Sequence, residues 1–174
     1  MTTPSPDLGF LPIDDLPPQD RIVALCKAAG REVSGIPLSG NPGEPVIAWV
    51  KFGAELTIGE ALTQDWVAKK LNEKPETTVR VPRVHAYFSR PSTAFVYGYI
   101  VMEYVDAPDC TVEDFKSVAQ AVQALISVRG PNSAPGHVGG GPLIHNFFAV
   151  DETSPFVYET VDELERHVNG VNVR

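Results

Sequence analysis

The stretch VIAWVKF, residues 46–52, decides the expected fold. Its residues are apolar, β-branched or aromatic, and Pro45 and Gly53 bound it, which is typical of a short buried strand. The strand contains a single charged residue, Lys51, close to its end. A lysine in this position is unusual in a buried strand, so the segments that follow it determine how it is interpreted.

A helix is predicted directly after this strand. Thr57 is a suitable N-cap and Glu60 follows three positions later, which is the spacing of a capping box. Apolar residues then recur at helical spacing until about residue 72, and Lys74-Pro75 ends the pattern. Trp49 and Trp66 are expected to pack between the strand and this helix.

Two further strands are predicted at residues 83–88 and 96–104, joined by the turn signal SRPS at residues 89–92. The pair is expected to form an antiparallel hairpin. The predicted fold class is therefore α+β, with a small antiparallel sheet and one helix packed on a face of it.

The rest of the chain divides around this unit. Residues 1–20 are proline-rich and predict an extended arm, and a short helix is expected at 21–29, closed by Gly30. Residues 32–45 indicate turns or a loose hairpin. A helix is expected after Thr111, and a loop is expected at 130–141. A last helix is expected over 160–168, with Glu163 at the capping-box position and Gly170 at its end. The helix after Thr111 has one apolar face, formed by Phe115, Val118, Ala119, Val122, Leu125 and Ile126.

Composition limits the classes of function. The chain has 174 residues, a net charge of −8 and a pI near 4.9, which argues against a nucleic-acid partner and against binding to anionic membranes. No apolar run approaches the length of a membrane span, and the first residues lack the features of a secretory signal, so a cytoplasmic protein is expected. Cys26 lies in an apolar run and is expected to be a buried free thiol, with little support for a disulfide to Cys110.

Lys51 and Glu60 are the first candidates for chemistry. A lysine near the end of a buried strand can hold its ammonium over the phosphates of a nucleotide, and a helix glutamate beside it keeps it oriented. The alternative is a lysine that extends to water and a glutamate used only for capping. The segment YIVMEYVDAP, residues 99–108, is apolar and then turns polar, and a linker of this kind can offer backbone groups to an adenine edge.

The runs VKFGAELTIGEALTQDWVAKKL, VPRVHAYF and YIVMEYVDAP, in this order, resemble the N-terminal lobe of aminoglycoside phosphotransferase-type kinases, particularly their fungal members. The resemblance extends to GHVGGGPL and SPFVYETVDELERHVNG, and so covers about residues 46–170. It implies a kinase-like N-lobe at 21–105, with a linker and a partial helical C-lobe at 106–174. It also implies that ATP or GTP, with Mg²⁺, binds between the lobes and that phosphate is transferred to a small hydroxylated molecule.

The resemblance assigns six residues to the nucleotide site. Lys51 matches the phosphate-binding lysine, and Glu60 matches its glutamate partner on helix C. Met102 matches the gatekeeper, and Glu103, Tyr104 and Val105 match the hinge.

The catalytic part of that pattern is absent from the sequence. The family has a His-Gly-Asp loop, whereas His145 is followed by Asn-Phe-Phe and Asp151 lies too far along. No aspartate heads a metal-binding motif, because Asp114 falls inside a predicted helix and Asp7 precedes Lys51. No G-x-G-x-x-G loop precedes Lys51. We therefore expect no catalytic residue and no metal site, and the four histidines and two cysteines show no metal-ligand spacing.

Three functions remain open from the sequence. The chain is a degenerate phosphotransferase-like protein that retains weak nucleotide binding, or a protein-interaction module on a kinase-like half-fold, or a fragment of an active small-molecule kinase completed by other sequence. An incomplete C-lobe would leave an apolar face exposed, which predicts self-association or a protein partner. His137 is expected to be exposed, and Gly139–Gly141 is expected to be a flexible connector rather than an anion-binding nest.

Overall fold

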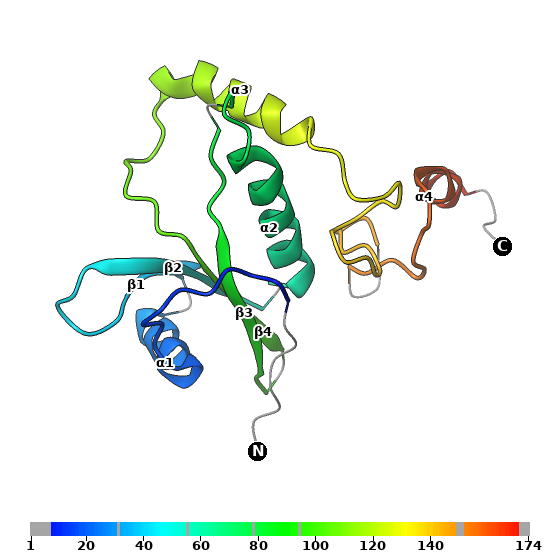
Figure 1. Cartoon of the computed structure of the whole chain (residues 1–174). Coiled ribbons are helices and arrows are strands. Elements are labelled where there is room, and N and C mark those ends of the chain that lie inside the picture. Colours follow the sequence, from blue (N-terminus) through cyan, green and yellow to red (C-terminus); the bar gives the residue numbers. More distant parts are fainter. Residues whose placement is uncertain are drawn as a thin grey trace.

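The computed structural model describes residues 8–30, 32–54, 56–77, 79–93, 95–148 and 152–170. The first seven residues of the predicted arm and Asp151 lie outside this description. The fold is α+β, as predicted: a four-stranded antiparallel sheet of order β1-β2-β4-β3 combined with four α-helices in the described part of the chain (Figure 1). The elements in chain order are α1 (Gln19–Ala29), β1 (Gly35–Ser39), β2 (Val46–Gly53), α2 (Ile58–Asn72), β3 (Val84–Pro91), β4 (Val96–Met102), the 3₁₀ turn η1 (Val112–Asp114), α3 (Phe115–Ile126) and α4 (Val161–Val168).

The predicted lysine strand is β2, and it lies inside the sheet between β1 and β4. Successive side chains point to opposite faces, so β2 divides its residues between two cores. Ala48, Val50 and Phe52 are buried toward α1, whereas Trp49 packs on the cluster that faces α2. Lys51 has the same parity as Trp49, which places it on the α2 face.

The first core lies between α1 and the sheet. Ile22 and Cys26 of α1 are 2% and 1% exposed, and they pack against Leu38, Val50 and the aromatic side chains of β3 and β4. The N-terminal arm contributes to this core through Ile13 and Leu16. The arm is therefore packed against the domain at Ile13 and Leu16.

The second core lies on the opposite face of the sheet, beneath α2 (Figure 1). Ala61 is fully buried there with Val84 and Ile100. Gly98 of β4 lets the segment at Leu56, just before α2, pass close to this face of the sheet. A Cβ atom at Gly98 would lie 2.0 Å from the carbonyl oxygen of Leu56. The sheet is thus covered on both faces, by α1 on one and by α2 on the other.

The ends of α2 are fixed by side-chain hydrogen bonds. The predicted cap is confirmed, because the hydroxyl oxygen of Thr57 accepts from the backbone N–H of Glu60 at 3.3 Å. At the other end, the Asn72 side chain bonds both the N–H and the carbonyl oxygen of Val81, at 2.9 and 2.8 Å. Gln64 donates to the carbonyl oxygen of Pro82 at 2.9 Å. These bonds hold α2 in register with the chain that enters β3.

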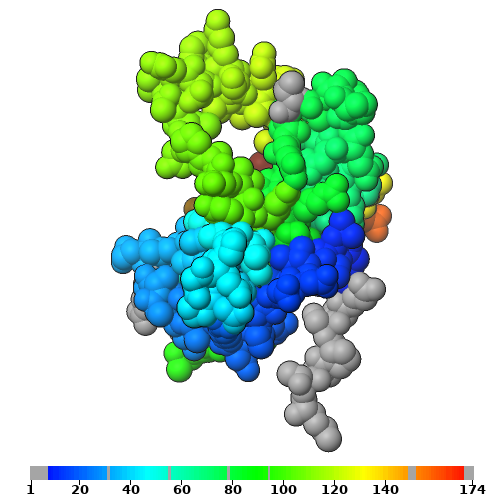
Figure 2. All heavy atoms as spheres, turned by 60° about the vertical axis from the view of Figure 1, so that its left-hand side comes forward, coloured from blue at the N-terminus to red at the C-terminus, as the bar shows by residue number. Residues whose placement is uncertain are grey.

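The chain beyond β4 is less compact. A linker leads from Met102 to α3, and Figure 2 shows an opening between this linker with α3 and the body formed by the sheet and α2. No residue of α3 is buried. The segment after α3 returns to α2 near its N-terminal end, and α4 follows it (Figure 1). None of the described helices is long and apolar enough to cross a membrane.

Two further predicted details can be compared with the structure. Of the turns or loose hairpin predicted at 32–45, the hairpin is found: β1 pairs with β2 in a register that includes Gly35 with Lys51 and shifts between Leu38 and Ser39. The prediction for Trp66 was wrong: its indole N–H donates to the carbonyl oxygen of Arg129 at 3.3 Å, and Lys70 lies over its ring at 4.6 Å. Trp66 therefore connects α2 to the end of α3 instead of packing on the sheet.

Candidate functional site

The structure brings Lys51 and Glu60 together. Lys51 comes from the interior strand β2 and Glu60 from the first turn of α2, and the Lys51 ammonium is hydrogen-bonded and ion-paired to the Glu60 carboxylate. The backbone of Glu60 is held by the Thr57 cap, so the helix start and the ion pair use different parts of one residue. The Glu60 carboxylate is therefore used for the ion pair, and the cap involves only its backbone N–H.

The ion pair is accessible to a ligand. The Lys51 and Glu60 side chains are 42% and 41% exposed. A pair with this exposure contributes only about 0–1 kcal/mol to stability, because water screens the charges and both side chains lose rotamer freedom. The pair therefore positions one ammonium group at the surface of the α2 face more than it stabilises the fold.

The predicted gatekeeper and hinge residues follow directly along β4. Lys51 is opposite Ile100 in the β2–β4 register, and Trp49 is opposite Met102. Ile100 and Met102 belong to the core that faces α2. Met102 is therefore two residues further along β4 on the same face, at roughly 7 Å from the Lys51 position along the strand.

The hinge residues differ in their surroundings. Both the side chain and the backbone N–H of Glu103 already have partners. Its carboxylate pairs with Arg80, and its backbone N–H donates to the carbonyl oxygen of Arg83 at 2.8 Å. Tyr104 is half-buried, and Val105 is 54% exposed. The carbonyl oxygen of Val105 accepts from Ala107 at 3.1 Å in a tight turn. Of the three predicted hinge residues, Val105 is thus the most exposed.

The loop that contains His137 is docked on α2, so the prediction that His137 is exposed was wrong. His137 is partly buried, because its ring lies against Gly59, where an added Cβ would come 2.3 Å from the imidazole. The backbone N–H of Val138 donates to the Thr63 hydroxyl at 2.9 Å. Gly139 approaches Leu62, with 2.8 Å from a notional Cβ to the leucine side chain. Residues 137–139 therefore contact the first two turns of α2.

Sequence reasoning missed this contact, although one signal was present. Gly59 is the second residue of α2, and a glycine within a helix is unfavourable relative to alanine unless another group approaches closely. Gly59 precedes Glu60 directly, so the docked loop lies beside the ion pair and not at a distance from it.

Acidic groups that could hold a metal are not gathered at this site. Asp65, the next carboxylate of α2, is buried and ion-paired to Lys69 at 2.6 Å. Among the described residues, no group of three or more His, Cys, Asp and Glu side chains is arranged to bind a metal ion. In the described part of the chain, the site therefore consists of the Lys51 ammonium paired with Glu60 and the nearby end of β4 at Met102, without a carboxylate cluster.

Comparison with known proteins gives no match: no family model, no curated protein and no solved structure is significantly similar to this chain.

Proposed function

We propose that the chain is a degenerate phosphotransferase-like protein, built on a kinase-like N-lobe, that binds a nucleotide weakly on the α2 face of its sheet. The observation that carries the proposal is the ion pair between Lys51 and Glu60. In kinases a strand lysine contacts the phosphates only when a glutamate of the neighbouring helix orients it. The order of a lysine strand, a glutamate helix and two antiparallel strands supports the same interpretation.

The proposed binding mode follows from the register of β2 and β4. The nucleotide phosphates lie at the Lys51 ammonium, and the adenine or guanine edge lies at the linker after Met102. Glu103 uses its own N–H within the sheet, so the base is held by the backbone of Tyr104 and Val105. Mg²⁺ would reach the site with the nucleotide phosphates. No transfer step is proposed, because no residue of the described site can act as the catalytic base.

Thermal unfolding with and without ATP and Mg²⁺ tests this function. A ligand that binds only the folded state stabilises it by RT ln(1 + [L]/Kd), so the melting temperature should rise with nucleotide concentration. Lys51→Ala should abolish this rise. Lys69→Ala is the control, because it removes another half-exposed, ion-paired lysine, from α2, while leaving Lys51 in place. The absence of a rise in the unaltered protein would exclude the nucleotide site.

A second candidate function, a protein-interaction module, is favoured by α3. Its apolar face is exposed throughout, with Phe115 65%, Val122 50% and Ile126 68% accessible. Apolar side chains in such a continuous stripe are characteristic of an interaction surface. The two functions use different parts of the chain, so each can be tested separately.

A further inference from the structure

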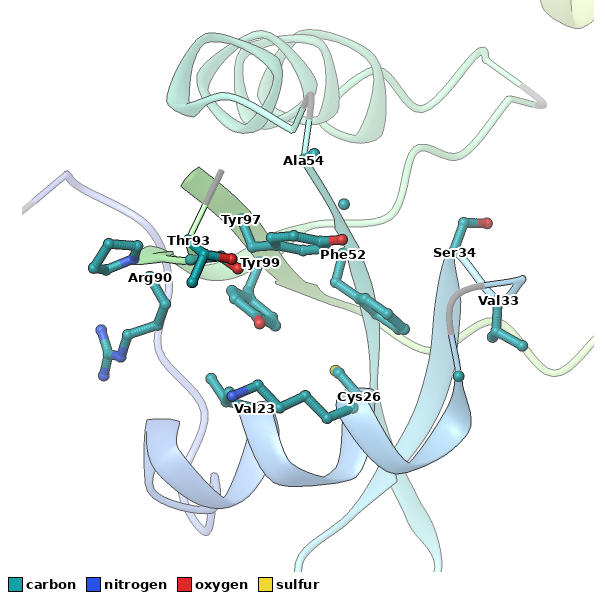
Figure 3. Close-up of a pocket in the computed structure, with 15 residues that line it drawn as sticks. Val23, Cys26, Val33, Ser34, Phe52, Ala54, Arg90, Thr93, Tyr97 and Tyr99 are labelled. Carbon is teal, nitrogen blue, oxygen red and sulfur yellow. The ribbon is translucent and has the colours of Figure 1, made fainter. Parts of the chain in front are cut away.

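A pocket of about 800 Å³ lies between α1 and the sheet, on the face opposite to Lys51. Val23 and Cys26 of α1 form one side of it, and Phe52 and Tyr99 point toward them from β2 and β4 (Figure 3). Val33, from the segment between α1 and β1, lies at one end of the pocket and Arg90 of β3 at the other (Figure 3). This volume is within the range of pockets that bind small molecules.

The aromatic side of the pocket is flat and rigid. Tyr99 is stacked between Phe52 and Phe88, with ring centroids 6.3 and 4.9 Å apart and interplanar angles of 16° and 8°. Phe52 and Tyr99 are almost fully buried by packing in the same core as Cys26 of α1, so the pocket borders these rings and does not separate them from α1. An apolar group in the pocket would contact Tyr99 and the partly exposed Tyr97.

The charge of the pocket is opposite to the charge of the protein. Two of the described residues that line it are charged, Lys27 and Arg90, and both are cations. The whole chain has 22 acidic and 14 basic side chains, so the charge of these described lining residues is opposite to the net charge of the protein. This contrast indicates an anionic ligand.

Arg90 is held at its end of the pocket by specific contacts. It donates to the Gln19 side chain at 2.7 Å and to the carbonyl oxygen of Ser89 at 3.1 Å, and it lies over the Phe88 ring at 5.4 Å. Asp20 approaches at 3.4 Å, but its side chain is 92% exposed, so this ion pair offsets little of the positive charge. Lys27 is in the last turn of α1, where the helix dipole already attracts its ammonium. The anion is therefore expected at Arg90.

We propose that this pocket is a binding site for a small amphiphilic carboxylate with a flat apolar body. The body lies in the pocket against Tyr97 and Tyr99, and the carboxylate accepts hydrogen bonds from Arg90 while the Lys27 ammonium adds attraction. The site is independent of the proposed nucleotide site because the sheet separates the two.

The test uses naphthaleneacetate and its neutral analogue naphthaleneethanol, titrated into the full chain and followed by calorimetry. Naphthaleneacetate should bind saturably and about tenfold more tightly than the alcohol, because a charge-assisted hydrogen bond is lost with the carboxylate. Arg90→Gln should reduce this affinity about tenfold, and Lys27→Gln should reduce it by a smaller factor. Val33→Trp should prevent binding by filling the pocket. Lys116→Gln, a surface lysine of α3, is the control and should bind as the unaltered protein does.

Equal affinities for the two probes would overturn the proposal, as would unchanged binding of naphthaleneacetate in both Arg90→Gln and Lys27→Gln. The absence of saturable binding in the unaltered protein would overturn it as well. Lys27 makes none of the contacts that join Arg90 to α1, so its variant keeps the test valid if Arg90→Gln is unstable. Nucleotide binding by the Lys51 site has no bearing on these outcomes.

Discussion

Gly59 of α2 lies directly under the imidazole ring of His137, and a Cβ atom at Gly59 would come 2.3 Å from that ring. The two residues are far apart in the sequence, yet their contact joins the segment after α3 to the first turn of α2. The contact is next to Glu60, so it also fixes the surroundings of the Lys51–Glu60 ion pair.

The first prediction concerns this contact. Alanine is favoured over glycine in a helix by up to about 1 kcal/mol, so Gly59→Ala would stabilise α2 if His137 were absent. With His137 present, the added methyl group overlaps the ring, and the free energy of unfolding should fall by about 1–3 kcal/mol. Denaturant unfolding of Gly59→Ala, His137→Ala and the double variant measures the coupling. A more stable Gly59→Ala single variant would show that the ring does not cover Gly59.

The second prediction compares two glycines that face each other in the β2–β4 register, Gly53 and Gly98. A Cβ at Gly98 would lie 2.0 Å from the backbone oxygen of Leu56, which cannot move without displacing the start of α2. A Cβ at Gly53 meets no atom within 4 Å. Gly98→Ala should therefore lose about 2 kcal/mol or more in unfolding free energy, and Gly53→Ala should change it by less than about 1 kcal/mol. Equal effects would contradict the close crossing at Leu56.

The third prediction concerns the two cysteines, which are both free. Burial raises the pKa of the Cys26 thiol from 9.0 to about 11, while Cys110 is exposed. Iodoacetamide at about pH 8 should therefore modify Cys110 in the folded protein and Cys26 only after unfolding, because the thiolate is the reactive form. Mass spectrometry of the unaltered chain and of Cys110→Ser distinguishes the sites. Rapid modification of folded Cys110→Ser would contradict the burial of Cys26.

The same pKa shift predicts a pH dependence of stability. Well below pH 9 the Cys26 thiol is protonated in both the folded and the unfolded chain, so it contributes no pH dependence there. Between pH 9 and about 11 the unfolded chain releases this proton and the folded chain retains it, so the free energy of unfolding falls as pH rises. Cys26→Ala should show a smaller fall than the unaltered protein over this interval in denaturant unfolding.

The fourth prediction concerns the apolar face of α3. If this face is an interaction surface, the protein should associate with itself or with a partner, and Val122→Lys should weaken that association at least about tenfold. Gln120→Lys is the matched control, since it adds the same charge on the opposite side of the helix. Sedimentation at increasing protein concentration measures self-association. A monomer at every concentration would exclude self-association through α3.

Local patterns predicted most of the sheet and the helices correctly. The strand at residues 46–52, the Thr57 cap and the hairpin of β3 and β4 follow from side-chain periodicity and capping chemistry, which act over a few residues. The pairing of Lys51 with Glu60 was one of two alternatives that the residues left open, and the family resemblance favoured it. At residues 32–45 a loose hairpin was predicted without a defined strand, because the Gly and Pro residues of β1 have weak strand preferences and the pairing with β2 defines it.

The features that sequence reasoning missed depend on contacts between distant segments. The docking of His137 on Gly59 depends on where the chain returns after α3. The pocket beneath α1 exists only because α1 covers the face that Phe52 and Tyr99 share. Trp66 was expected in the core, yet its indole N–H donates to the carbonyl oxygen of Arg129. The periodicity of α2 alone gives no information on this contact with a distant segment.

We propose that Lys51, held by Glu60, binds the phosphates of a nucleotide. This binding can be measured by equilibrium titration of ATP with Mg²⁺ into the unaltered chain, Lys51→Ala, Glu60→Gln and Lys69→Ala. Saturable binding is expected for the unaltered chain and for Lys69→Ala, with affinity reduced at least about tenfold in Lys51→Ala and by less in Glu60→Gln. Equal affinities for the unaltered chain and Lys51→Ala, or no binding by either, would contradict it.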